Sequence, residues 1–119
     1  MKLPFYIVDV FAEEKYAGNQ LAVFLNADGL NTEEMQKIAR EINFAESTFI
    51  TSIQPENNSA EIRIFTAEHE MQFAGHPIIG TSWVLMKENF IVECYALNTI
   101  RLWKMRPPEV RVPVCKLFF

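Results

Sequence analysis

The sequence predicts an α+β fold in which a helix packs into a curved, largely antiparallel sheet. The first observation is a set of short segments, rich in aromatic and β-branched residues and separated by turns, that read as four strands before residue 67. The second is helical spacing in two places, between the second and third of these strands and again after the fourth. The resulting order, strand, strand, helix, strand, strand, helix, is typical of an α+β domain.

The chain opens with a predicted hairpin. Leu3 to Phe11 is rich in aromatic and β-branched residues and reads as a buried strand, for which we expect a central place in the sheet. Tyr16 to Asn19 reads as a turn, and Gln20 to Leu25 has the composition of a second strand. The two strands are therefore expected to pair through a long connecting loop.

The first helix is predicted to follow Asn31. The side chain of Asn31 can cap the helix, and Glu34 stands three positions further on, which is the spacing of a capping box. Four apolar residues then recur at helical spacing and define one face: Met35, Ile38, Ala39 and Ile42. We expect this face to pack against the sheet.

A polar turn separates the third and fourth predicted strands. Phe44 to Thr51 alternates as a strand does, and residues 60–66 have the composition of another strand. Between them, residues 52–59 contain one proline and two asparagines and read as a turn.

Glu46 is the first candidate functional residue. In a strand from Phe44, alternation places Glu46 on the same face as Thr48 and Ile50. A carboxylate among apolar neighbours is partly desolvated, which favours its protonated form and lets one group both give and take a proton. Alternatively, the strand begins after Glu46, and the carboxylate lies in a hydrated loop.

The second helix is predicted to begin at Pro77. Its fixed φ suits the first helical position, where a missing N–H costs nothing, and the helix then runs to about Glu88. Gly75 and His76 would lie at the positive end of the helix dipole, where free backbone N–H groups bind a substrate carboxylate or a developing oxyanion. The same pattern also opens core helices in proteins that bind nothing there, and His76 can equally be a capping or a core histidine.

Composition excludes several classes of function. Half of the 119 residues are hydrophobic, enough for a packed core, and there is neither an apolar run long enough to span a membrane nor a convincing signal peptide. A net charge of −4 provides no basic surface for nucleic acid. His69 lacks further ligands at a metal spacing, and Cys94 and Cys115 can be ordinary reduced thiols. We therefore expect a cytoplasmic protein with no metal, no nucleic-acid partner and no membrane partner.

A change in charge marks a boundary near Asn89. Residues 1–88 carry six Lys/Arg against thirteen Asp/Glu, a net of −7, whereas residues 89–119 carry five against two, a net of +3. We therefore divide the chain into a domain over residues 1–88 and a divergent tail over residues 89–119. Residues 91–92 and 110–114 have strand-like composition, so part of the tail can pair with the sheet or form an ordinary hairpin.

Three ordered motifs resemble those of the phenazine-biosynthesis PhzF-like protein family. The motifs are Gly18-Asn19-Gln20-Leu21-Ala22-Val23-Phe24, residues 38–49 with Phe44-Ala45-Glu46-Ser47-Thr48-Phe49, and Arg63-Ile64-Phe65-Thr66 continuing to Phe73-Ala74-Gly75-His76-Pro77. Their spacing is compatible with the family over residues 3–88, which makes the match specific. The resemblance implies the diaminopimelate-epimerase-like fold, in which two similar halves each wrap a sheet around a central helix and the active site lies between them. This chain resembles the first half only.

The resemblance also implies a site and a reaction. Glu46 corresponds to the family's catalytic acid/base. Gly75 and His76 correspond to its substrate-binding turn, and Asn19 lies near that site. The implied function is a cofactor-independent isomerase that moves a proton between carbons of a small unsaturated or cyclic carboxylic acid, as in phenazine biosynthesis. A partly buried carboxylate beside a fixed anion site can do this without a metal or a nucleotide.

The main departure from the family is the second half, which supplies a further acid and a Gly-Ser-type anion-binding turn. No such motif follows Glu88. A truncated gene, a frameshift or an alternative ending would account for the tail after Asn89, as would divergence within the family. We expect the chain to form a homodimer that completes the cleft. The alternative is a catalytically incompetent half-fold that binds a small acid or a protein partner.

Overall fold

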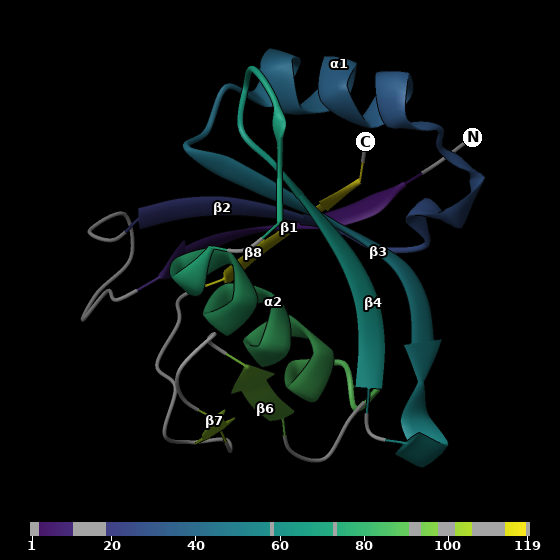
Figure 1. The fold of residues 1–119 in the computed structure, drawn as a ribbon, viewed down its shortest axis with the longest axis vertical. Helices are drawn as coiled ribbons and strands as arrows, with labels where there is room; N and C mark the ends of the chain where they lie inside the picture. The colour runs from purple at the N-terminus through teal and green to yellow at the C-terminus, as the bar shows by residue number, and fades with distance from the viewer. Residues whose placement is uncertain are drawn as a thin grey trace.

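A six-stranded sheet lies between two helices (Figure 1). The computed structural model describes residues 3–10, 19–57, 59–72 and 74–90, and in the tail the strands at 94–97, 102–105 and 114–118. Helix α1 (Thr32–Ile42) covers one face of the sheet and helix α2 (Gly75–Lys87) the other. A second sheet of two strands, β6 (Cys94–Leu97) and β7 (Leu102–Met105), lies beside α2. The predicted α+β fold is confirmed.

The large sheet has the strand order β5-β4-β3-β2-β1-β8. Its strands are β1 (Pro4–Val10), β2 (Asn19–Phe24), β3 (Glu46–Gln54), β4 (Ser59–Phe65), β5 (Glu70–Met71) and β8 (Val114–Phe118). All neighbours are antiparallel except β2 and β3, which run parallel and are joined through α1. The sheet is therefore largely antiparallel, as expected, although β1 lies next to an edge strand and not at the centre.

Helix α1 carries the predicted capping box. Asn31 Oδ1 accepts a hydrogen bond of 2.9 Å from the Glu34 N–H, and the Glu34 carboxylate accepts one of 2.9 Å from the Asn31 N–H. The helix ends at Asn43, whose φ of 58° is left-handed. The predicted apolar face packs against the sheet, with Met35 and Ala39 buried.

Helix α2 begins two residues earlier than predicted. Ala74 has extended backbone and precedes the helix, so Gly75 and His76 are the first two helical residues and Pro77 is the third. A proline is tolerated there because the first N–H groups of any helix have no acceptor within it. The prediction that Pro77 opens the helix is therefore wrong, whereas the end near Glu88 is confirmed.

Strand β3 starts later and ends later than the sequence predicts. It begins at Glu46 and continues to Gln54, through the first part of the predicted turn. The register with β4 shifts between Ile50 and Ser52, so Thr51 forms a bulge in the strand. The bulge lets pairing continue through polar residues that read as a turn. Another short strand, β5, lies between β4 and α2 in the chain.

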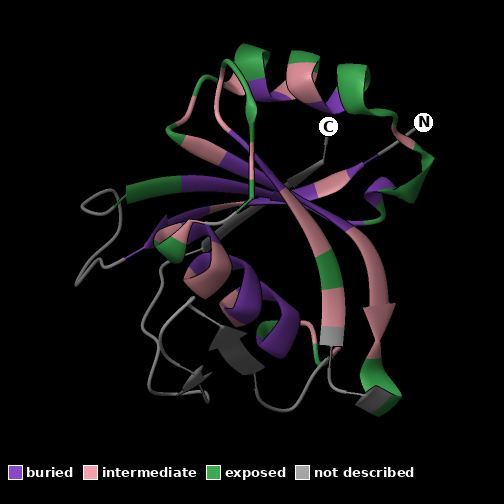
Figure 2. Ribbon diagram, in the orientation of Figure 1, coloured by how far each residue is buried: buried purple, intermediate pink, exposed green. Residues whose placement is uncertain are grey.

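The two faces of the sheet carry two separate apolar cores (Figure 2). The core on the α2 side comprises Tyr6, Val8, Val10, Leu21, Val23, Leu25, Ile50, Val84, Leu85 and Met86. The core on the α1 side comprises Leu3, Phe5, Ala22, Phe24, Ala27, Met35, Ala39, Phe49 and Phe65. Figure 2 shows that α1 exposes its outer face, whereas α2 is buried or half-buried along most of its length. Helix α2 is therefore the central helix of the expected fold.

Four phenylalanines, one from each of four neighbouring strands, pack together in the α1-side core. Phe5 stacks on Phe24 with 5.0 Å between ring centroids, and Phe24 stacks on Phe49 at 4.8 Å. Phe49 then meets Phe65 edge-on at 5.4 Å. Because aromatic pairs across strands add to the energy of burial, this row stabilises the sheet from β1 to β4.

Part of the tail extends the sheet. Strand β8 pairs with β1 in antiparallel register, and β6 pairs with β7. Of the strand-like segments predicted in the tail, Val114 is the first residue of β8, whereas residues 91–92 and 110–113 lie outside the described residues. Helix α2 ends just before Asn89, but the domain boundary there stays a prediction.

Candidate active site

Glu46 and His76 lie side by side where β3 and α2 begin. Glu46 Oε2 is 3.2 Å from His76 Nε2, and the two side chains are only 17% and 15% exposed. Glu46 is the first residue of β3, so the alternative in which it precedes the strand in a hydrated loop is wrong. His76 is the second residue of α2. Two candidates from distant parts of the sequence thus meet in one place.

Strand pairing directs Glu46 towards α2. Glu46 pairs with Leu21 of β2, and Thr48 pairs with Val23. Residues paired across two strands share a face of the sheet, and both Leu21 and Val23 belong to the α2-side core. Glu46 therefore extends over an apolar surface, as the predicted alternation required. The core removes water from one side of its carboxylate.

The first turn of α2 presents backbone N–H groups beside this pair. The N–H groups of Gly75 and His76 have no acceptor within the helix, and Ala74 offers no capping side chain, in contrast to Asn31 at the start of α1. The helix dipole adds partial positive charge at the same place. Apart from its two chain neighbours and the backbone of α2 itself, no atom of the described residues lies within 4 Å of the position that a Cβ on Gly75 would take. The turn is therefore open to an anion such as a carboxylate.

The close approach of Glu46 and His76 does not amount to a hydrogen bond. Glu46 Oε2 and His76 Nε2 are almost wholly buried, yet neither has a hydrogen-bond partner among the described residues. Buried polar atoms in native proteins nearly always have a partner. A ligand with its own donor and acceptor groups would satisfy both atoms. The pair is therefore suited to bind a polar ligand and to exchange a proton with it.

Asn19 lies at the same edge of the sheet but outside this contact. It is the exposed first residue of β2 and not part of a turn as predicted. Since β2 and β3 are parallel, both begin at this edge, with Asn19 two residues before Leu21, the partner of Glu46. Neither Glu46 Oε2 nor His76 Nε2 bonds to Asn19. Asn19 is therefore placed to contact only a ligand that extends beyond Glu46.

The described residues contain no cluster of three or more His, Cys, Asp or Glu side chains that could hold a metal ion. His69 is exposed, with Nδ1 3.3 Å from Thr66 Oγ1. The same Thr66 oxygen accepts hydrogen bonds from the backbone N–H groups of Glu68 and His69, so these residues stabilise a turn. Within the same part of the chain, no helix is long and apolar enough to cross a membrane.

Arg63, to which the sequence analysis gives no role, holds the segment that leads into α2. Its Nε and Nη2 donate hydrogen bonds of 2.7 Å to the two carboxylate oxygens of Glu70, and Nη2 also donates one of 2.9 Å to Thr32 Oγ1. The bonds from Arg63 hold the pKa of the Glu70 carboxyl below its usual value. The hydrogen bond to Glu70 also raises the pKa of the Arg63 guanidinium. The network ties β4, β5 and the start of α1 together.

Three residues have buried hydroxyl groups that the sequence analysis did not single out. Ser47, Thr48 and Thr81 are 1%, 0% and 1% exposed, and their side-chain oxygens have no hydrogen-bond partner among the described residues. The sequence contains one signal for such a group, namely a serine or threonine at a strand position that alternation assigns to the core. Thr48 stands at such a position, two residues after Glu46.

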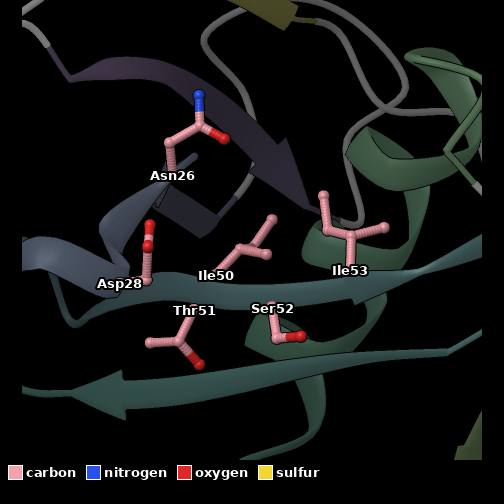
Figure 3. A pocket seen from close by; sticks show the side chains of 6 residues that line it. All are labelled: Asn26, Asp28, Ile50, Thr51, Ser52 and Ile53. Atoms are coloured by element: carbon pink, nitrogen blue, oxygen red, sulfur yellow. The ribbon is translucent and has the colours of Figure 1, made fainter.

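Two surface depressions do not include the Glu46–His76 contact, although one of them reaches Ala45, the residue before Glu46. Figure 3 shows one of about 240 Å³, lined by Asn26, Asp28, Ile50, Thr51, Ser52 and Ile53. In that view Thr51 and Ser52 point to the opposite side of β3 from Asn26 and Asp28, so these polar groups do not converge. The other, of about 440 Å³, is lined by residues 43–45 and 66–69. Neither depression includes Glu46 or His76.

Solved structures share this fold. A phenazine biosynthesis protein of the PhzF family from Bacillus anthracis matches with a TM-score of 0.70 and 26% identity, over 89% of this chain and 36% of that one. A predicted epimerase from Pseudomonas aeruginosa matches with a TM-score of 0.70 and 36% identity, over 78% of this chain and 33% of that one. The sheet wrapped around α2 therefore has the diaminopimelate-epimerase-like fold.

The family model for phenazine biosynthesis-like proteins (PhzC-PhzF) matches residues 8–101. The chain therefore belongs to the phenazine biosynthesis-like protein family, which confirms the resemblance seen in its motifs. It is 43% identical over 95 residues to an uncharacterized isomerase of Pasteurella multocida, covering 80% of this chain and 33% of that protein. It is 46% identical over 84 residues to the trans-2,3-dihydro-3-hydroxyanthranilate isomerase of Pseudomonas aeruginosa, covering 71% and 30%. The chain spans about a third of the length of these relatives.

Proposed function

We propose that this chain carries the acid/base site of a cofactor-independent isomerase, which moves a proton between two carbons of a small unsaturated or cyclic carboxylic acid. The similarity to a trans-2,3-dihydro-3-hydroxyanthranilate isomerase makes a dihydroaromatic acid the first class of substrate to test. One observation carries the proposal. A carboxylate that is only 17% exposed lies 3.2 Å from an imidazole at the start of a helix that has no capping side chain.

In the proposed reaction, Glu46 acts first as a base and then as an acid. Its carboxylate takes a proton from a carbon next to the unsaturated system, the C–H electron pair delocalises into that system, and Glu46 becomes a carboxylic acid. Glu46 then returns the proton to a different carbon of the same system. One C–H bond breaks, another forms and a double bond shifts, so Glu46 ends ionised and no oxidant or reductant is consumed.

The start of α2 would hold the substrate during this transfer. The backbone N–H groups of Gly75 and His76 would bind the substrate carboxylate, and the helix dipole would stabilise negative charge that spreads onto it. The imidazole of His76 would bind a second polar group next to the reacting carbons. Interactions of this kind accelerate a reaction when they are stronger in the charged intermediate than in the substrate.

Deuterium uptake tests the proposal directly. The parent protein and Glu46→Gln are incubated with a dihydroaromatic acid in heavy water, and deuterium at the substrate carbons is followed by NMR. Glutamine keeps the shape and hydrogen-bonding capacity of glutamate but cannot carry the proton, so exchange should fall by about 10²–10⁴-fold. Binding of the carboxylate should survive, since that role belongs to the start of α2. Equal exchange in the two proteins would exclude Glu46 as the acid/base.

The second candidate function is a catalytically incompetent half-fold that binds a small acid or a protein partner. It is favoured by the start of α2, which has no capping side chain and could bind an acid without any proton transfer. On this alternative, the parent binds the acid but exchanges no proton. On the isomerase proposal, a homodimer would supply the facing half of the cleft, and exchange would rise with the fraction of dimer.

A further inference from the structure

We infer that the buried hydroxyl of Thr48 positions the Glu46 carboxylate through one internal water, which bridges the two side chains. The inference rests on the proposed function, because it adds a positioning residue to the same site. It assigns a polar role to a residue that alternation alone places in the apolar core.

Thr48 and Glu46 point the same way. They are two residues apart in β3, so both side chains extend from the face of the sheet that α2 covers. Their Cα atoms are about 6–7 Å apart along the strand. One water can bridge the two side-chain oxygens with two hydrogen bonds of about 2.8 Å each.

Both groups have a buried oxygen that makes no hydrogen bond to the described residues, although Glu46 Oε2 lies 3.2 Å from His76 Nε2. Thr48 is 0% exposed, and neither its Oγ1 nor Glu46 Oε2 has a hydrogen bond among the described residues. Thr48 lies between Val23 and Ile64 on the neighbouring strands, where a valine would have nearly the same shape and no hydroxyl to satisfy. An unsatisfied buried hydroxyl costs free energy that valine avoids. Packing therefore gives no reason for threonine, whereas a water-bridged hydrogen bond to Glu46 does.

Such a bond would fix the direction of the carboxylate. A water that is held by the Thr48 hydroxyl and donates to Glu46 Oε2 would keep this oxygen next to His76 and leave the other oxygen to meet the substrate. The reacting group then needs no reorientation when the substrate binds, which is the benefit of a preorganised site. Thr48 itself does not touch the substrate.

Ser47 provides a matched control. It directly follows Glu46, it is 1% exposed, and its Oγ also lacks a partner. Its partners in the sheet are Ala22 and Phe65, which belong to the α1-side core, so Ser47 points away from Glu46. Ser47→Ala therefore removes a buried hydroxyl next to Glu46 in the sequence but on the wrong face of the sheet.

The first measurement does not depend on turnover. The ¹³C signal of the Glu46 side-chain carboxyl, assigned by its loss in Glu46→Gln, is recorded in the parent, Thr48→Val, Thr48→Ser and Ser47→Ala. Thr48→Val should move the signal, because the carboxylate loses a donor, while Thr48→Ser should restore it. A signal that Thr48→Val leaves in place, or that Ser47→Ala moves as far, overturns the inference.

The second measurement is the rate of proton exchange into a dihydroaromatic acid. Thr48→Val should lower the maximal rate about tenfold at an unchanged KM, since the carboxylate is still present but less well oriented. Thr48→Ser should recover most of the rate, and Ser47→Ala should match the parent. A change in KM alone counts against positioning. If the parent exchanges no proton, the proposed function fails, and the carboxyl signal alone decides whether Thr48 bonds to Glu46.

Discussion

Gly80 and Leu21 approach so closely that a Cβ on Gly80 would lie 2.6 Å from Leu21 Cδ2. Leu21 is the strand partner of Glu46, and Gly80 follows His76 by about one turn of α2. How closely α2 packs against β2 therefore sets the distance between Glu46 and His76. The glycine is required here for the close approach of a helix to a sheet.

Gly80→Ala should destabilise the protein by about 1–3 kcal/mol, because the added methyl group meets Leu21 and Val10 in a packed core. It should also lower proton exchange by moving His76 away from Glu46. The free energy of unfolding is measured by urea denaturation. Gly75→Ala is the control, since nothing lies within 4 Å of the Cβ it adds. A Gly80→Ala protein as stable as the parent would show that α2 is not seated as described.

His76→Gln should reduce the rate of proton exchange about 10²–10³-fold, because it removes the imidazole beside the carboxylate. The backbone N–H at position 76 remains, so the affinity for the substrate carboxylate should change much less. Initial rates at several substrate concentrations separate the two effects. A variant with a normal maximal rate and a raised KM would assign His76 to binding alone.

Asn31→Ala should cost about 1 kcal/mol of stability, since it removes a capping side chain that accepts a hydrogen bond of 2.9 Å. Glu34→Gln should cost less, because glutamine can make the reciprocal bond of the capping box. Both changes lie on the α1 side and should leave proton exchange at the parent level. Urea denaturation measures the loss of stability, and the exchange assay measures the rate of proton exchange. If a folded Asn31→Ala protein lost proton exchange, the α1 side of the sheet would not be independent of the site on the α2 side.

The Arg63–Glu70 pair should stabilise the protein at neutral pH and not in acid. Hydrogen bonds from Arg63 lower the pKa of folded Glu70 below its usual value. A group of this kind contributes stability above its unfolded pKa and loses it as the pH falls through the folded pKa. Since the Glu70 side chain is 38% exposed, Glu70→Gln should cost less than about 1 kcal/mol at pH 7.

Urea denaturation of the parent and of Glu70→Gln at pH 7 and at pH 3 tests this expectation. The difference between the two proteins should shrink at the lower pH, because the stabilisation by the Glu70 charge falls once the pH is below the unfolded pKa and is lost as the pH falls through the lower folded pKa. A difference of the same size at both pH values would show that the charge of Glu70 contributes nothing.

The chain should self-associate at high concentration. Several apolar residues on α2 and on the outer parts of β3 and β4 are only partly buried: Ile53, Ile62, Ile79 and Trp83. Apolar surface of this kind is commonly covered by a partner. Sedimentation velocity over a range of concentrations should show a dimer, and Trp83→Gln should weaken it without loss of helix. A protein that stays monomeric throughout would exclude a second copy as the facing half.

The sequence predicted best those features whose signals are local. The capping box of Asn31 and Glu34 depends on a spacing of three residues, and the structure has both of its hydrogen bonds. The predicted start of α2 at Pro77 is wrong, because a proline is tolerated throughout the first turn of a helix and Pro77 alone does not distinguish these positions. The bulge at Thr51 has no clear signal in the sequence, so the extension of β3 was not predicted.

The sequence predicted the individual residues of the candidate site but not the distances between them. Glu46 and His76 each follow from their own motif, yet their 3.2 Å contact depends on how closely α2 approaches the sheet. Alternation placed Thr48 correctly on the inner face but could not show that its hydroxyl would be left without a partner. The resemblance to the family predicted Asn19 as a residue near the site. Asn19 lies at the edge of the sheet where β3 also begins, but it takes no part in the contact between Glu46 and His76.

The parallel pairing of β2 with β3 bears on the order in which the molecule assembles. The hairpins β1–β2 and β3–β4 join strands that are neighbours in the sequence, whereas β2 meets β3 only after the chain has crossed over through α1. Contacts that close long loops form late, because the entropy of closure must be overcome first. Glu46 belongs to the first residue pair of the parallel register between β2 and β3. His76 belongs to α2, which follows all four of these strands in the sequence. A chain in which only the two hairpins had formed would therefore not bring Glu46 and His76 together, so their contact depends on the late, non-local steps of folding.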